Sequence, residues 1–127
     1  MLFERKQYLQ QLVSAENNRM IKIVTGIRRC GKSFLLFNIY KKHLLDRGVS
    51  ADHIIEINLE DRRNKNLRDP DALLAYIDSR MKDSEKYFIL LDEIQLVPEF
   101  EDVLNSYLHI ENAEVYVTVS NAKFLSK

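Results

Sequence analysis

The stretch VTGIRRCGKSFLL, residues 24–36, decides the fold of this chain. It fits the pattern G-x-x-x-x-G-K-[ST], in which backbone N–H groups surround a phosphate. Its glycines, Gly26 and Gly31, permit the tight turns that this loop requires. A β-branched run at residues 20–25 precedes it, and a helically periodic run from residue 32 to about 47 follows it. The stretch therefore predicts a phosphate-binding loop between a strand and a helix.

The loop also predicts which residues contact the nucleotide. We expect Lys32 to reach the β- and γ-phosphates and the hydroxyl of Ser33 to ligate Mg²⁺. The N-terminus of the following helix adds a favourable site for an anion. The full predicted nucleotide-binding set is Gly26, Ile27, Arg28, Arg29, Cys30, Gly31, Lys32, Ser33 and Phe34.

Three positions inside the loop leave two interpretations open. Arg28 and Arg29 either point to solvent or contact phosphate, a neighbouring subunit or nucleic acid. Cys30 lies beside a helix N-terminus and cations, conditions that lower a thiol pKa, so its oxidation would block nucleotide binding. The alternative is that Cys30 is a small residue that fits the loop.

A second motif, FILLDEIQ, supplies acids about 60 residues downstream. Four apolar residues predict a strand buried on both faces, and Asp92 and Glu93 end it. Asp92 is expected to hold Mg²⁺, usually through water, together with Ser33 and phosphate oxygens. Glu93 is expected to orient or deprotonate the attacking water. The catalytic prediction is therefore Glu93 and Lys32, with Asn121 as the third member, and the metal prediction is Ser33 with Asp92.

Strands and helices alternate along the chain. The predicted strands are 20–25, 53–60, 87–93 and 114–120, the predicted helices are 4–14, 32–47, 71–82 and 98–109, and residues 61–70 are predicted as a polar loop. We expect Leu36, Phe37, Tyr40, Leu44 and Leu45 to share one helix stripe. Alternation of this kind predicts an α/β fold, a mainly parallel sheet between two layers of helices.

Ligands of such sheets bind beyond the carboxyl ends of the strands. Gly26, Asn58, Asp92 and Asn121 all lie at or just past predicted strand ends. Asn121, or Ser120 before it, is expected to hydrogen-bond the γ-phosphate or the attacking water, although a plain turn is the alternative. Asn58 is a weaker candidate for restraining Glu93.

Size and composition favour one domain. The 127 residues are 46% hydrophobic and 30% charged, which is enough for one modest core, and the net charge is zero. Residues 1–63 carry 12 basic and 7 acidic side chains, and residues 64–127 carry 7 basic and 12 acidic ones. The half that contains the phosphate-loop motif is therefore basic, and the half that contains LLDE is acidic. A single cysteine and no apolar signal core or membrane-length run predict a cytoplasmic protein without membrane contact. Nothing in the composition indicates nucleic acid binding.

Four segments together carry a family resemblance: IVTGIRRCGKS, INLED, LLDEIQ and YVTVSNAKFLS. They resemble the N-terminal ATPase domain of prokaryotic AAA-like P-loop ATPases, which usually carry a further C-terminal domain of uncertain role. The resemblance implies ATP and Mg²⁺ as ligands and a strand order 5-1-4-3-2. It also implies Walker A roles for Lys32 and Ser33, Walker B roles for Asp92 and Glu93, and a sensor role for Asn121.

The chain departs from similar proteins in two ways. They have a glycine at the position of Val119, so a shifted Ser120–Asn121 turn is expected here. They also continue into a fifth strand, an arginine finger and the C-terminal domain. Residues 1–127 are therefore expected to be the N-terminal portion of a truncated domain with sheet order 1-4-3-2. Its first strand would form an exposed edge that invites self-association, with the missing domain or a partner protein completing it.

Two functions remain open on the sequence. One is an ATPase module that binds MgATP and hydrolyses it to ADP and phosphate, aided by missing C-terminal parts or a partner arginine. The other is a nucleotide-binding regulatory or interaction module without turnover, since an arginine finger is worth roughly 10³–10⁵ in rate. A P-loop kinase rarely has a glutamate directly after the metal-binding aspartate, where this chain has Glu93. The sequence also shows no basic groove lined with aromatic residues of the kind a nucleic-acid motor uses.

Overall fold

The computed structural model describes residues 9–18, 20–26 and 31–120. Four strands form one sheet in the order β1-β4-β3-β2, and every neighbouring pair is parallel. The strands are β1 (Lys22–Gly26), β2 (Ile54–Asn58), β3 (Tyr87–Asp92) and β4 (Ala113–Ser120). The predicted α/β class and the order 1-4-3-2 are confirmed.

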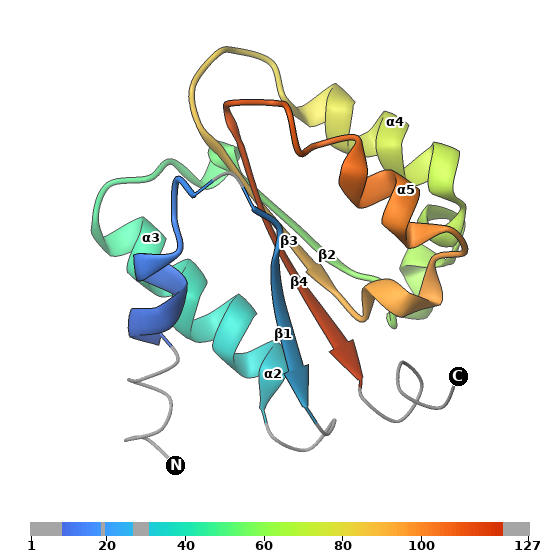
Figure 1. The fold of residues 1–127 in the computed structure, drawn as a ribbon, viewed down its shortest axis with the longest axis horizontal. Coiled ribbons are helices and arrows are strands. Elements are labelled where there is room, and N and C mark those ends of the chain that lie inside the picture. The colour runs from blue at the N-terminus through green and yellow to red at the C-terminus, as the bar shows by residue number, and fades with distance from the viewer. Residues whose placement is uncertain (1–8, 19, 27–30, 121–127) are drawn as a thin grey trace.

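Helices cover both faces of the sheet and complete three layers (Figure 1). One face carries the helical residues 9–14 and a long helix made of α2 (Lys32–Phe34), a π-helical stretch (Leu35–Tyr40) and α3 (Lys41–Asp46). The other face carries α4 (Pro70–Arg80) and α5 (Phe100–Asn105). Short 3₁₀ turns at Ala51–His53, Arg62–Arg68 and Ile94–Leu96 fill the connections.

The strand β3 lies between two hydrophobic cores and contributes side chains to both. All six of its residues are buried, as the apolar run predicted. Side chains alternate across a strand, so Phe88 and Leu90 pack with the long helix whereas Ile89 and Leu91 pack with α4 and α5. This double burial fixes the strand that presents the two acids.

The long helix differs from its prediction in one position. Leu36, Tyr40 and Leu44 are fully buried, Phe37 is half-buried, and Leu45 is 41% exposed rather than inward. Steps of four residues return nearly to the same side of a helix, whereas the one further step to Leu45 turns it by about 100° toward solvent.

Two other segments differ in extent. The predicted loop 61–70 contains the 3₁₀ turn Arg62–Arg68, which begins where the Asp61 side chain accepts a hydrogen bond from Arg63 N at 2.9 Å. The predicted helix 98–109 shortens to α5, because the chain passes into hydrogen-bonded turns after Asn105. The α4 prediction is close, and Asp69 caps that helix by accepting from Ala72 N at 2.9 Å.

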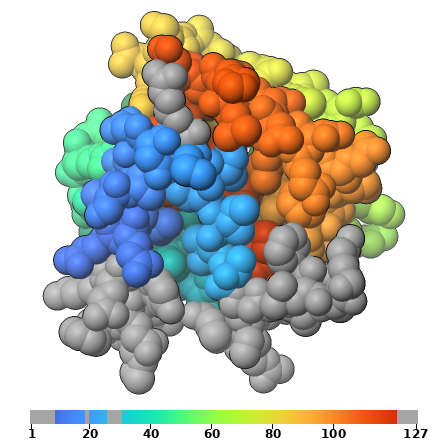
Figure 2. Space-filling model, viewed as in Figure 1, coloured from blue at the N-terminus to red at the C-terminus, as the bar shows by residue number. Residues whose placement is uncertain are grey.

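Within the described part of the chain, β1 pairs with β4 alone and forms an edge of the sheet. The light-blue atoms around β1 lie at the surface between the darker blue helical segment and the orange residues near α5 (Figure 2). The Ile23 side chain on β1 is 51% exposed. Self-association through this edge stays a prediction. Across the described residues, no helix has both the length and the apolar character that a membrane span requires.

Candidate functional site

The carboxyl ends of the four strands lie together at one end of the sheet and bring several of the predicted residues there. Gly26 ends β1 and lies opposite Ser120, the last residue of β4. Asn58 ends β2 and lies opposite Asp92, the last residue of β3. Asn121 lies outside the described residues, so its sensor role stays a prediction.

The phosphate loop is described only at its two ends. Ile27, Arg28, Arg29 and Cys30 lie outside the described residues, and their predicted contacts stay predictions. Gly31 has φ 83° and precedes α2, a left-handed conformation that only glycine adopts without strain. Its loop motif therefore needs glycine at this position for a backbone reason.

The three residues that follow Gly31 begin the long helix and differ in exposure. Lys32 is buried, with 4% of its surface exposed, whereas Ser33 and Phe34 are exposed. The helix begins directly at Lys32, so these residues are held by the same backbone that packs against the sheet.

Ser33 and Asp92 are brought together across 59 positions of sequence. The Ser33 hydroxyl donates to Asp92 Oδ2 at 2.7 Å. With its proton directed at the carboxylate, the serine oxygen keeps its lone pairs for another partner. An exposed hydroxyl oxygen beside a carboxylate is the kind of oxygen pair that Mg²⁺ takes from proteins.

Thr118, two residues before the end of β4, connects the two acids. Its hydroxyl donates to Asp92 Oδ1 at 2.5 Å and accepts a hydrogen bond from Glu93 N at 2.8 Å. The Thr118 side chain is fully buried. One hydroxyl thus holds the carboxylate of the first acid and the backbone of the second.

Glu93 leaves the strand in a left-handed conformation, with φ 60° and ψ 53°. In a continued strand, consecutive side chains would point to opposite faces of the sheet. The turn at Glu93 breaks that alternation and brings its carboxylate, like that of Asp92, to hydroxyls of β4. A non-glycine residue in this conformation costs on the order of 1–2 kcal/mol, which the hydrogen bond from Glu93 N to Thr118 helps to offset.

The Glu93 carboxylate is buried and held by two uncharged donors. Ser120 Oγ lies 2.6 Å from Oε1 and 2.9 Å from Oε2, and Gln95 Nε2 donates to Oε1 at 2.6 Å. The predicted restraint by Asn58 is wrong: Asn58 Oδ1 instead accepts from Glu60 N at 3.0 Å. Asn58 sits at the end of β2, on the far side of β3 from β4, whereas Ser120 is on β4 itself.

Thr118 and Gln95 were not predicted from the sequence. The available signal was weak: the run T-V-S at residues 118–120 places two hydroxyls two positions apart, hence on one face of a strand. The family resemblance places β4 beside β3, but only the structure shows that the β4 hydroxyls reach the two acids.

The metal prediction can be compared with the donor atoms present. Across the described residues, no group of three histidine, cysteine or acidic side chains converges as a self-sufficient metal site. Mg²⁺ keeps several waters and binds through one or two carboxylates together with substrate phosphates. The donor pair Ser33 and Asp92 fits that mode of binding, which needs phosphate oxygens to complete the coordination.

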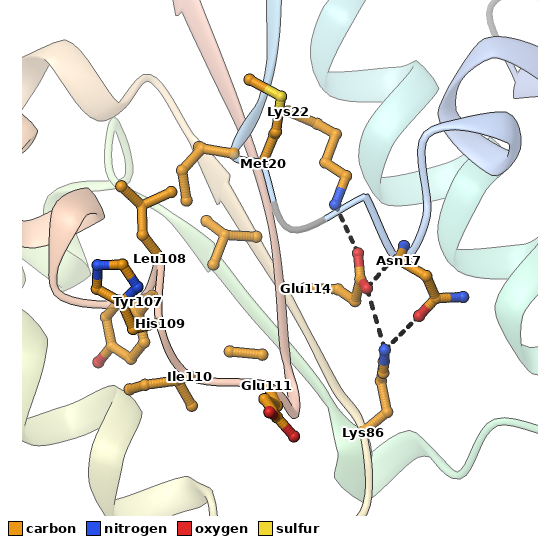
Figure 3. A pocket seen from close by; sticks show the side chains of 13 residues that line it. Asn17, Met20, Lys22, Lys86, Tyr107, Leu108, His109, Ile110, Glu111 and Glu114 are labelled. Carbon is orange, nitrogen blue, oxygen red and sulfur yellow. Dashed lines mark hydrogen bonds and ion pairs between the residues drawn. The ribbon is translucent and has the colours of Figure 1, made fainter.

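A cavity of about 230 Å³ opens at the opposite end of the sheet (Figure 3). Lys22, which begins β1, and Lys86 donate to Glu114 at 2.6 and 3.1 Å, and Asn17 N donates to it at 2.9 Å. Burial alone would raise the Glu114 pKa, but the hydrogen bonds from the two lysines lower it below its usual value. These residues tie the segment after helix 9–14 to the sheet, away from the carboxyl edge.

A model of the AAA domain family matches residues 18–127 of the chain. The chain belongs to the AAA domain family. Membership implies nucleotide binding by an ATPase-like module, and the part of the AAA domain described here contains the predicted order of strands and the contact between Ser33 and Asp92.

Two curated proteins are similar to this chain. An uncharacterized protein of Haemophilus influenzae is 33% identical over 126 residues, which is 98% of this chain and 31% of that protein. An uncharacterized protein of Methanocaldococcus jannaschii is 34% identical over 108 residues, which is 84% of this chain and 22% of that protein. The chain thus spans about a third or less of the length of these relatives.

Proposed function

We propose that this chain is the ATP-binding module of an AAA-like ATPase, which binds MgATP and hydrolyses it to ADP and phosphate. The observation that carries the proposal is the 2.7 Å contact between Ser33 Oγ and Asp92 Oδ2. It joins the end of the phosphate-loop motif to the acid that ends β3, and these are the two protein ligands that MgATP uses in P-loop proteins.

In this proposal the loop and the acids have separate tasks. The loop from Gly26 to Gly31 surrounds the phosphates with N–H groups, and Lys32 binds the β- and γ-phosphates. Ser33 and Asp92 hold Mg²⁺, which when bound neutralises charge on the phosphate oxygens. The burial of Lys32 and Asp92, at 4% and 2% exposure, supports strong electrostatic interactions there.

Glu93 is the proposed general base for the attacking water. The water oxygen bonds to the γ-phosphorus while the bond from that phosphorus to the bridging oxygen of ADP breaks. One proton of the water passes to the Glu93 carboxylate and is later released to solvent. Positioned general bases contribute roughly 10²–10⁴ in rate. An arginine finger from the continuing chain or from a partner would add charge stabilisation in the transition state.

ATP turnover and nucleotide affinity of the purified chain test this proposal. Wild type is measured beside Glu93→Gln and Lys32→Ala, with Glu85→Gln and Lys65→Ala as matched controls on exposed residues. We expect Glu93→Gln to bind ATP as wild type does but to lose turnover, Lys32→Ala to lose binding, and both controls to resemble wild type.

Two outcomes contradict parts of the proposal separately. If wild type and Glu93→Gln both bind ATP and neither hydrolyses it, this chain is a nucleotide-binding module without turnover. If Lys32→Ala binds nucleotide as tightly as wild type, the loop is not a phosphate cradle and the proposal fails at its first step.

A further inference from the structure

The side chains around Glu93 come from two different elements. Ser120, at 2% exposure, ends β4, and Gln95 lies in the 3₁₀ turn Ile94–Leu96 that follows β3. The serine hydroxyl reaches both carboxylate oxygens at 2.6 and 2.9 Å, and the glutamine amide donates to one of them at 2.6 Å. Rotation of the Glu93 side chain would break these hydrogen bonds, so its direction is set by both elements.

The direction follows from the order of the strands. Ser120 lies opposite Gly26 in the register of β4 and β1, and β1 runs directly into the phosphate loop. Glu93 leaves β3, which borders β4 on the other side. The hydrogen bond to Ser120 therefore draws the Glu93 carboxylate from β3 across to the strand that borders the loop.

The two hydroxyls of β4 divide the two acids between them. Thr118 holds Asp92, whose other oxygen accepts from Ser33, whereas Ser120 holds Glu93. Each acid is thus fixed by its own donor on the same strand face. The orientation of Glu93 depends on Ser120 and Gln95 without passing through the proposed metal ligands.

We propose that Ser120 and Gln95 are positioning residues, which hold the Glu93 carboxylate toward the phosphate loop so that it can accept the proton of the attacking water. This inference rests on the proposed function. The sequence offered Ser120 as an alternative to Asn121 for contacting the γ-phosphate or the attacking water, whereas its hydroxyl here lies against the Glu93 carboxylate. The proposal assigns neither Ser120 nor Gln95 a contact with the nucleotide. Their loss is therefore expected to affect the chemical step and to leave ATP binding unchanged.

The expected effect is a separation of kcat from KM. Because a general base is worth roughly 10²–10⁴ in rate and requires hydrogen-bond reach of its proton, we expect Ser120→Ala to lower kcat by about tenfold or more. KM and the Kd for ATP should stay within about twofold of wild type, since the interactions that bind ATP equally in the ground state and the transition state are kept. Ser120→Thr, which keeps the hydroxyl, should restore kcat, and Gln95→Ala should lower it.

The experiment measures steady-state turnover and equilibrium ATP binding for these variants. Ser106→Ala and Gln10→Ala are the matched controls, since both residues are exposed. A parallel measurement records the ¹³C resonance of the Glu93 carboxyl carbon, assigned as the signal lost in Glu93→Gln. We expect this resonance to shift in Ser120→Ala and Gln95→Ala and to return toward its wild-type position in Ser120→Thr.

Several results would overturn the inference. A higher kcat in Ser120→Ala would mean that the serine restrains Glu93, and an unchanged kcat would mean that it does not orient it. A rise in KM with kcat retained would place Ser120 on the nucleotide instead.

The spectroscopic measurement separates this inference from the proposed function. If wild type turns over no faster than Glu93→Gln, the hydrolysis proposal fails, and the positioning of a base fails with it. In that case a shifted Glu93 resonance in Ser120→Ala would support only the hydrogen bond between Ser120 and Glu93, and not a role in hydrolysis. An unshifted resonance would overturn the arrangement whatever the turnover of wild type.

Discussion

Replacing Thr118 by valine removes one hydroxyl and keeps the shape of the side chain. That hydroxyl is fully buried, donates to Asp92 Oδ1 at 2.5 Å and accepts from Glu93 N at 2.8 Å. The substitution leaves a buried backbone N–H without this acceptor and a buried carboxylate without this donor. Both groups lose hydrogen bonds that water cannot readily replace at this depth.

The size of the effect follows from these two losses. A hydrogen bond to a charged group contributes about 1.5–3 kcal/mol, and an unsatisfied buried donor costs about 1–3 kcal/mol. Valine recovers part of this through its preference for strands. We therefore expect Thr118→Val to lower the free energy of unfolding by about 2–4 kcal/mol.

Urea unfolding followed by circular dichroism measures this change. With a slope of about 1–2 kcal/mol per molar urea, the midpoint should fall by roughly 1–4 M at unchanged slope. Thr118→Ser keeps the hydroxyl and should lose only about 1 kcal/mol for its missing methyl group. Thr25→Val, on the exposed side of β1, is the matched control and should stay within about 0.5 kcal/mol of wild type.

The reasoning fails if Thr118→Val unfolds within about 0.5 kcal/mol of wild type, a change typical of surface positions. It also fails if Thr118→Ser is as unstable as Thr118→Val, because the methyl group rather than the hydroxyl would then carry the effect.

Three further predictions concern parts of the fold away from Asp92 and Glu93. The pKa of Glu114 is lowered in the folded state, so this carboxylate adds stability above its unfolded pKa of about 4.5, and that stability is lost as pH falls through the folded pKa. Glu114→Gln should therefore flatten the fall in stability between about pH 5 and 3, measured by urea unfolding at each pH. An unchanged dependence of stability on pH would contradict this prediction. Tyr40→Phe removes a hydroxyl that donates to Glu16 at 2.6 Å and lies 2.7 Å from that of Tyr116, so it should cost about 1–3 kcal/mol. Equal midpoints in thermal unfolding would show that the contact with Glu16, in the turn after helix 9–14, contributes nothing. Leu73→Ala, at a fully buried position of α4, should cost about 2–5 kcal/mol in the same assay, and a change under about 1 kcal/mol would indicate that α4 is not packed as described.

The sequence predicted the buried strand that ends in Asp92 and the helix that begins at Lys32, because their signals are local. The two glycines and Lys32-Ser33 occupy fixed positions within eight consecutive residues, and the apolar run before Asp92 indicates its own burial. The class of the sheet followed from the alternation of strands with helices. The predicted order of the strands came from the resemblance to a family rather than from periodicity.

The differences from the sequence-based predictions have separate physical causes. Asn58 was considered for Glu93 because both lie at strand ends, but the Glu93 carboxylate turns to Ser120 of β4, on the other side of β3 from Asn58. The left-handed turn at Glu93 has no sequence signal, since glutamate rarely adopts it. The exposure of Leu45 follows from its place one residue beyond the buried stripe.

The sequence by itself determined the phosphate-loop motif, the buried strand that ends in two acids, and the parallel α/β class, because each depends on residue types at fixed short spacings. The family resemblance predicted that β4 lies between β1 and β3, and only the tertiary structure decided that Thr118 and Ser120 meet Asp92 and Glu93. These contacts join residues 26 or 27 positions apart. They arise from the packing of helices on both faces of the sheet, which sets the neighbours and register of each strand.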